Sequence, residues 1–256
     1  MALTFGGATS DRVNCGSGAS LDDLSPFTWM AWIYPTAFTS GRRLAEKGSS
    51  TQKVMLLSGT SGDWRLQVAR TVASNYITND TPLALNTWKF VAATFDTGGG
   101  AGEIINLYTG GLNTIATESS YTSPADGSGA VTADASGDFV IGNVGVATFN
   151  QAFEGRIAFF GVWNRALSLG EIRAQQFRPH VTSGCVLFQY LGFAGTGTQP
   201  DYSGNANAGT VTGATVSDHV PIGPIWGRAD GWAGAFTAAG APPASGHTRR
   251  TLMGVG

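Results

Sequence analysis

Short apolar runs that alternate with polar residues, each bounded by Gly, Ser, Asn or Asp, fill the chain from residue 1 to about residue 165. This pattern predicts β-strands joined by turns. In Phe27–Pro35 both alternating faces are apolar, which indicates a central strand covered on both sides. The 37 glycines show no collagen-like repeat and are expected at turns and bulges. We therefore expect an all-β protein, an antiparallel sandwich of two sheets.

One segment after these runs is predicted to be a short surface helix, from Ser168 to Phe177. Ser168 and Glu171 have the spacing of a capping box, in which each side chain satisfies a backbone N–H at the helix start, and Pro179 ends the helix. From Pro221 the composition changes to Gly, Ala and Pro. We expect one domain over residues 1–220 and an extended C-terminal arm over residues 221–256.

The charge and hydropathy of the sequence argue against binding to nucleic acid or to a membrane. The formal net charge is −2, only 12% of residues are charged, and Lys and Arg are scattered, so no basic patch for nucleic acid is expected. No apolar run approaches the ~20 residues that cross a bilayer, so no membrane association is expected. The opening MALTFGGATS lacks the basic start and apolar run of a secretory signal peptide. We expect the protein to be made in the cytoplasm.

The chain has two cysteines, Cys15 and Cys185, with no Cys-x-x-Cys motif or Cys/His cluster. A structural zinc site is therefore not predicted. The two residues are either buried thiols or one long-range disulfide, and a reducing compartment favours the thiols.

Motifs for catalysis are missing. Glycan cleavage needs two carboxylates in one cleft, which alternate positions of one strand could supply, and neither an E-x-D-x-x-E nor an E-x-D-x-E pattern occurs in the chain. His180, His219 and His247 lie far apart, without a zinc-protease motif, and no nucleophile elbow is present. We therefore expect no enzymatic activity.

A series of segments resembles the laminin-G-like, pentraxin-like branch of the concanavalin A-like lectin and glucanase superfamily. In chain order they are ALTFGGATSDRV, SPFTWMAWIYP, LALNTWKFVAATFD, LYTGG, FVIGN, FEGRIAFFGVWNRALSLGEI and DYSGNANAGTVTGAT, covering most of residues 1–219. The resemblance implies a jelly-roll sandwich of two antiparallel sheets.

The order of the segments departs from that of the family. The segment from Asp201 to Gly209 precedes the ALTF segment in the family but comes last here, so the domain resembles a circular permutant. Permutation is tolerated where chain ends lie together on the surface. We therefore expect residues 187–193 to pair inside the same sandwich as residues 2–14, which would bring Cys185 towards Cys15.

The resemblance also implies a calcium site, because many relatives hold calcium at loop ends. Asp11, Asp201 and Asn205 are the oxygen donors in matching or neighbouring segments. The alternative is that Asp and Asn at turns bond their own backbone. The turn interpretation is favoured, because calcium takes six to eight oxygens, and no cofactor is expected to be required.

Exposed aromatic side chains could stack on sugars, and Trp64, Tyr76 and Tyr121 are candidates because each lies beside polar turns. Alternation places the other large aromatic residues in the core; these include Trp29, Trp88, Phe90, Phe95 and Trp163.

The C-terminal arm carries Trp226, Trp232 and Phe236, which are expected to bury against the domain or a neighbouring subunit. Our first hypothesis is a non-catalytic structural and binding module that forms a homo-oligomer or decorates a larger assembly, such as the surface of a phage virion. The virion setting is an analogy, because laminin-G-like domains recur in phage structural proteins. The alternative is a carbohydrate-binding lectin, which could depend on calcium.

Overall fold

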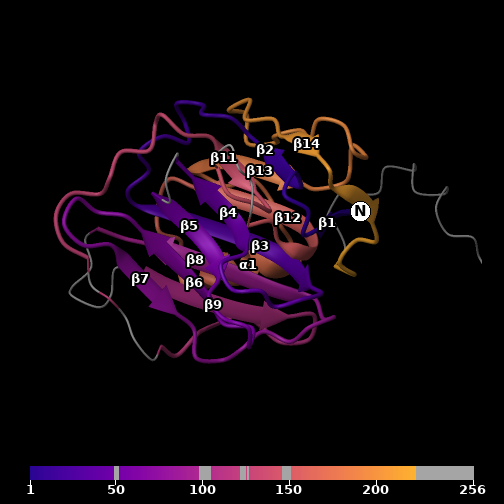
Figure 1. Ribbon diagram of the computed structural model, residues 1–256, viewed down its shortest axis with the longest axis horizontal. Helices are drawn as coiled ribbons and strands as arrows, with labels where there is room; N and C mark the ends of the chain where they lie inside the picture. The colour runs from indigo at the N-terminus through magenta and orange to yellow at the C-terminus, as the bar shows by residue number, and fades with distance from the viewer. Residues whose placement is uncertain (49–51, 98–104, 122–124, 126, 146–150, 223–256) are drawn as a thin grey trace, which may run out of the picture. The chain divides into compact units, whose positions relative to one another are not determined.

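The computed structural model describes residues 1–48, 52–97, 105–121, 125, 127–145 and 151–222 (Figure 1). Fifteen strands in this part form two antiparallel sheets, as predicted. The eight-stranded sheet has the order β10 (Thr117–Glu118), β9 (Ile105–Gly111), β8 (Lys89–Phe95), β3 (Phe27–Pro35), β12 (Glu154–Trp163), β1 (Ala2–Gly6) and β15 (Thr215–Ser217), and β13 (Cys185–Tyr190) also pairs with β12. The seven-stranded sheet has the order β14 (Thr210–Thr212), β2 (Arg12–Asn14), β11 (Phe139–Ile141), β4 (Arg43–Lys47), β5 (Lys53–Leu57), β6 (Trp64–Val68) and β7 (Asn75–Thr78).

The main core lies between the two sheets. Trp29 of the central strand β3 is 1% exposed, and its ring lies 5.0 Å from the ring of Phe139 on the opposite sheet and 6.4 Å from that of Phe160. These edge-to-face contacts are the arrangement that aromatic rings prefer. The apolar inner positions of the alternating strands thus fill one continuous core, which confirms the predicted jelly-roll sandwich.

A second apolar cluster covers much of the outer face of the eight-stranded sheet. The helix α1 (Leu169–Phe177) packs there through Ile172, over Trp32 and Phe90. Trp32 donates from Nε1 to the Gln176 carbonyl at 2.7 Å. This helix explains why β3 is apolar on both faces, as its sequence predicts. No helix in the described residues is long and apolar enough to cross a membrane.

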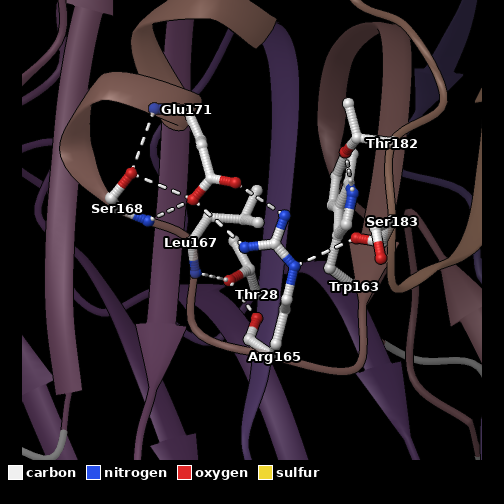
Figure 2. Close-up of polar contacts among 8 residues, drawn as sticks. All are labelled: Thr28, Trp163, Arg165, Leu167, Ser168, Glu171, Thr182 and Ser183. Carbon is white, nitrogen blue, oxygen red and sulfur yellow. Dashed lines mark hydrogen bonds and ion pairs between the residues drawn. The ribbon is translucent and has the colours of Figure 1, made fainter.

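The start of α1 is fixed by a polar network (Figure 2). Ser168 accepts a hydrogen bond from the Glu171 backbone N–H, and the Glu171 carboxylate accepts one from Ser168 N, so the predicted capping box is confirmed. Arg165 donates two hydrogen bonds to the same carboxylate, at 2.7 and 3.1 Å, and these lower the pKa of Glu171 to about 2. Thr28 of β3 ties the segment to the sheet, donating to Arg165 O and accepting from Leu167 N. The lowered pKa means that this stabilisation is present above pH ~4.5 and is lost as the pH falls towards 2.

Two buried lysines fasten loops to one end of the sandwich. Lys47 and Lys53 are each 1% exposed and lie opposite each other on β4 and β5. Lys47 pairs with Asp22 at 2.7 Å, and Lys53 pairs with Asp134, which is fully buried. Because both carboxylates come from loops, the loops are held to the sheet by charge.

The late strand β13 lies where its sequence predicts. It pairs with residues 159–163 of β12, whereas β1 pairs with residues 154–157 of the same strand. Residues 187–190 therefore share a sheet with residues 2–6. Both β1 and β13 lie next to β12, β1 along its first half and β13 along its second half. The last two strands also pair with the first two: β14 pairs with β2, and β15 pairs with β1.

Both cysteines are buried free thiols, so the disulfide alternative is not formed. Cys15 lies in the core between the sheets, with its Sγ donating to Gln189 of β13 at 3.7 Å, whereas Cys185 belongs to the outer cluster. Burial raises the pKa of both thiols, that of Cys185 to about 12. Neither thiol is therefore primed to react as a thiolate.

Candidate functional site

A hollow of about 370 Å³ opens at the end of the eight-stranded sheet, where β3, β8 and β9 meet. Two aromatic rings form part of it, and amide and hydroxyl side chains surround them. The residues that line it are Tyr34, Asn86, Thr87, Trp88, Lys89, Gly111, Leu112, Asn113 and Thr114.

Strand register brings the two rings together. Ile33 pairs with Lys89, so the next positions, Tyr34 and Trp88, lie side by side. Their ring centroids are 5.4 Å apart and the rings are tilted by 59°. Both side chains are partly exposed. The prediction that Trp88 belongs to the core holds in part: Trp88 packs against the outer apolar cluster but stays partly exposed, whereas Phe90 on the same face is fully buried.

The turn between β9 and β10 forms one wall of the hollow, and a buried glutamine fixes it. The turn is closed by a hydrogen bond from Gly111 N to Thr114 O, at 2.9 Å. Gln176 of α1 donates from Nε2 to the Gly111 and Thr114 carbonyls, both at 2.8 Å, and accepts from Ala116 N at 2.7 Å. Because Gln176 is fully buried, the wall is held rigidly to the helix.

This arrangement suits a ligand that has both apolar faces and hydroxyl groups. Partly exposed aromatic rings offer flat apolar surface, and nearby amides and hydroxyls can donate and accept hydrogen bonds. Asn86, Thr87, Asn113 and Thr114 are all exposed at the rim of the hollow. A sugar ring has both kinds of surface.

The structure places the three aromatic candidates elsewhere. Trp64 is fully buried in the core between the sheets, so its predicted exposure was wrong. Tyr76, on the outer face of the seven-stranded sheet, is partly exposed and lies under the Arg65 guanidinium, 5.3 Å from it. The Tyr121 hydroxyl accepts from Leu107 N at 2.9 Å and contacts Glu118, and burial raises its pKa. None of the three lines the hollow.

Asp201, one of the calcium candidates, serves its own turn. Its Oδ1 accepts from Phe188 N and Ser203 N, both at 2.9 Å, and its Oδ2 accepts from Ser203 Oγ at 2.8 Å and Asn207 N at 3.0 Å. The Asn205 amide donates to Cys185 O and Ser203 Oγ. These hydrogen bonds join residues 201–207 to one another and to β13, which is what the turn interpretation expects of Asp and Asn side chains.

Asp11, the third calcium candidate, closes the turn between β1 and β2. It is 4% exposed, and its Oδ2 accepts from Gly6 N at 2.7 Å and from Ala8 N at 3.4 Å. Across residues 1–48, 52–97, 105–121, 125, 127–145 and 151–222, no three His, Cys, Asp or Glu side chains form a cluster that could hold a metal ion.

Every glutamate in the described residues has a polar partner. Glu46 is fully buried beside Arg43 at 3.0 Å, Glu154 pairs with Arg42 at 3.0 Å, and Glu118 and Glu171 bond Tyr121 and Arg165. Glu103 lies outside the described part. None of the four described glutamates lines the aromatic hollow.

A second hollow, of about 400 Å³, lies at the edge of the seven-stranded sheet, between β2, β11 and β14. Asn14 and Asp138 are hydrogen-bonded there at 2.7 Å, and Arg12, Thr210 and Thr212 also line it. Its lining has no aromatic ring, so it lacks a surface for stacking. The predicted arm residues Trp226, Trp232 and Phe236 lie outside the described residues.

Comparison with solved structures finds several similar chains. A crystal structure described as a "putative carbohydrate binding protein" from Bacteroides ovatus has a TM-score of 0.60 and 18% identity, covering 87% of this chain and 61% of that chain. A heptameric SAP-like pentraxin from Limulus polyphemus has a TM-score of 0.46 and 14% identity, covering 68% and 80%. Domains LG4-5 of the mouse laminin α1 chain have a TM-score of 0.46 and 12% identity, covering 66% and 43%. None of the curated proteins matches the chain.

The sequence itself matches a family model. The model is a laminin G model, described as the concanavalin A-like lectin/glucanases superfamily, and the match extends over residues 6–173. This range includes the strands that form the aromatic hollow and the network at the start of α1. Because the match covers more than half of the chain, the protein belongs to the concanavalin A-like lectin/glucanase superfamily.

Proposed function

We propose that this protein is a non-catalytic carbohydrate-binding module whose ligand lies over Trp88 and Tyr34. The observation that carries the proposal is the hollow in which these two partly exposed rings are surrounded by amide and hydroxyl side chains. The description of the Bacteroides ovatus protein as carbohydrate-binding agrees with it.

Replacing Trp88 with alanine is expected to weaken glycan binding about tenfold or more, because an aromatic anchor at the centre of a contact contributes ~1.4 kcal/mol or more. A glycan array followed by calorimetry on the best ligand measures the effect. Tyr76→Ala is the matched control, since Tyr76 is a partly exposed aromatic residue on the other sheet. Unchanged binding by Trp88→Ala, together with a loss of binding by Tyr76→Ala, would show that the site lies on the seven-stranded sheet and would contradict the proposal.

The same samples test the absence of catalysis and of a cofactor. Binding is expected to leave the oligosaccharide intact, because the described glutamates are engaged in ion pairs and hydrogen bonds. A chelator is expected to leave the affinity unchanged, because Asp11 and Asp201 already accept backbone hydrogen bonds. Release of reducing ends would contradict the first expectation, and a loss of affinity with chelator would contradict the second.

We also propose a role in assembly, through the arm over residues 221–256. Three exposed apolar side chains around the start of β1 support it: Met1 is 54% exposed, Val216 40% and Phe193 59%. Val216 pairs with Leu3 of β1, and a Cβ at Gly192 would lie 2.5 Å from the Ala2 carbonyl oxygen, so the three positions surround one strand. Decoration of a larger particle, such as a virion, would use such a surface.

Light scattering tests the assembly proposal. The full chain is expected to be a defined oligomer, and a chain that ends at His219 is expected to be a monomer at the same concentration. Monomers in both samples would contradict a role of the arm in assembly, and would leave the carbohydrate proposal untouched.

We further infer that the domain is a circular permutant of the family arrangement. The contacts of the late strands support this: β15 pairs with β1, β14 with β2, and β13 lies beside β1 along β12. Burial lowers the pKa of the Met1 amino group, and the charge of the Asp218 carboxylate partly opposes this shift. The two ends of the predicted domain therefore lie near each other, as a permutation requires.

A further inference from the structure

A straight row of side chains runs across the outer face of the eight-stranded sheet, just beyond the part that α1 covers. The strand register defines this row. Thr4 of β1 pairs with Thr215 on one side and with Arg156 on the other, and Arg156 pairs with Tyr34. Because Ile33 pairs with Lys89 and Lys89 with Gly111, the next positions are Tyr34, Trp88 and Leu112, which extend the row. We call this the outer row; its members are Thr215, Thr4, Arg156, Tyr34, Trp88 and Leu112. The aromatic hollow is one end of it.

The outer row is accessible where the neighbouring positions are not. Arg156, Tyr34, Trp88 and Leu112 are all partly exposed. Two residues further along β3, Trp32 is fully buried and bonded to α1. The helix therefore covers β3 at Trp32 but not at Tyr34, and the outer row lies next to the edge of the helix.

Arg156 is the cation of the outer row. Its guanidinium lies 5.0 Å from the centre of the Tyr34 ring, which holds it in a stacked position. Within the described residues its guanidinium forms no hydrogen bond or ion pair, so no carboxylate of this part of the chain accepts from it. The nearest carboxylate along the strand, that of Glu154, pairs with Arg42 at 3.0 Å.

A guanidinium that stacks on an aromatic ring and has its donors available fits a carboxylate of a ligand. From Trp88, the residue before β8, to Arg156 on β12 the row crosses two strand spacings, about 10 Å, so a single sugar over Trp88 would not fill it. The row has one cation and the hollow at its end adds only Lys89, and the chain has a net charge of −2, which disfavours a polyanion such as nucleic acid.

We propose that the ligand is an acidic oligosaccharide, with one sugar ring over Trp88 and Tyr34 and a carboxylate of another sugar on Arg156. This inference rests on the proposed carbohydrate function and specifies its ligand class. Arg156 then determines the preference for a charged glycan, and Trp88 contributes affinity to charged and neutral glycans alike.

The test uses the full chain and an array of oligosaccharide pairs, in which each uronic-acid oligosaccharide stands beside its methyl ester. The members of a pair differ in charge and hardly in shape. The wild type is expected to bind an acidic member about ten- to a hundredfold more tightly than its ester, because a charge-assisted hydrogen bond contributes that much. The preference is expected to shrink as the salt concentration rises.

Variants separate charge from stacking. Arg156→Gln is expected to lose the preference for the acidic member and to keep the affinity for the ester. Arg156→Lys keeps the charge but lacks the planar guanidinium, and its preference for the acidic member is expected to lie between those of the wild type and Arg156→Gln. Arg178→Gln is the matched control, since Arg178 is an exposed cation outside the outer row, and it is expected to behave as wild type.

The outcomes distinguish the two proposals. Equal binding of acid and ester by the wild type, or an Arg156→Gln variant that keeps the preference, overturns the acidic ligand; if Trp88→Ala still loses affinity, the carbohydrate proposal stands. Binding of no oligosaccharide on the array overturns both.

Discussion

Replacing Asp134 with alanine is expected to lower the free energy of unfolding by about 3–5 kcal/mol, because the change leaves the Lys53 ammonium buried without its partner. The Asp134 carboxylate also accepts from Asp23 N at 2.7 Å, so the loop around Asp23 loses an anchor as well. Chemical denaturation followed by fluorescence measures the change.

Two further variants show whether the buried charge is the cause. The double variant Lys53→Met/Asp134→Leu is expected to recover much of the lost stability, since it removes both charges and keeps the volume filled. Asp218→Ala removes an exposed carboxylate and is expected to change stability by less than ~0.5 kcal/mol. A loss below ~1 kcal/mol in Asp134→Ala would mean that the pair does not hold the loops.

The second large effect is expected at Gln176. Replacing it with alanine leaves the Gly111 and Thr114 carbonyls and the Ala116 N–H without the partner they have in α1, and is expected to lower the free energy of unfolding by about 2–4 kcal/mol. Because these groups belong to the wall of the aromatic hollow, glycan affinity should fall as well.

Gln175→Ala provides the matched control for Gln176. Gln175 is the adjacent buried glutamine of α1 and accepts from His180 N at 2.8 Å, away from the hollow. We expect Gln175→Ala to lower the free energy of unfolding by at least ~1 kcal/mol less than Gln176→Ala does, and to leave the glycan affinity unchanged. Equal effects of the two variants on affinity would contradict a positioning role of Gln176.

Local features of the fold could be predicted from the sequence. The capping box of α1 joins two residues three positions apart, and the alternation in β3 shows directly that both of its faces are buried. Trp64 was misassigned because polar turn residues precede it, yet it shares the alternation of Leu66 and Val68, which face the core. That pattern could have corrected the prediction.

The site depended on contacts that a sequence does not specify. Tyr34 and Arg156 lie on β3 and β12 and Trp88 directly precedes β8, and only the register of these strands puts the three residues in one row. Alternation correctly places Trp88 on the same face as Phe90, but cannot tell where the cover by α1 ends. Lys53 alternates with Met55 and Leu57, which suggests an inward position, but its partner Asp134 is 81 residues away in a loop.

The most direct test of the account is a crystal structure of the full chain with the tightest-binding oligosaccharide from the array. The account predicts a sugar ring stacked over Trp88 and Tyr34, with the rest of the ligand extending along the outer row towards Arg156. A ligand in the hollow beside Arg12 and Asp138, or on the outer face of the seven-stranded sheet near Tyr76, would contradict it.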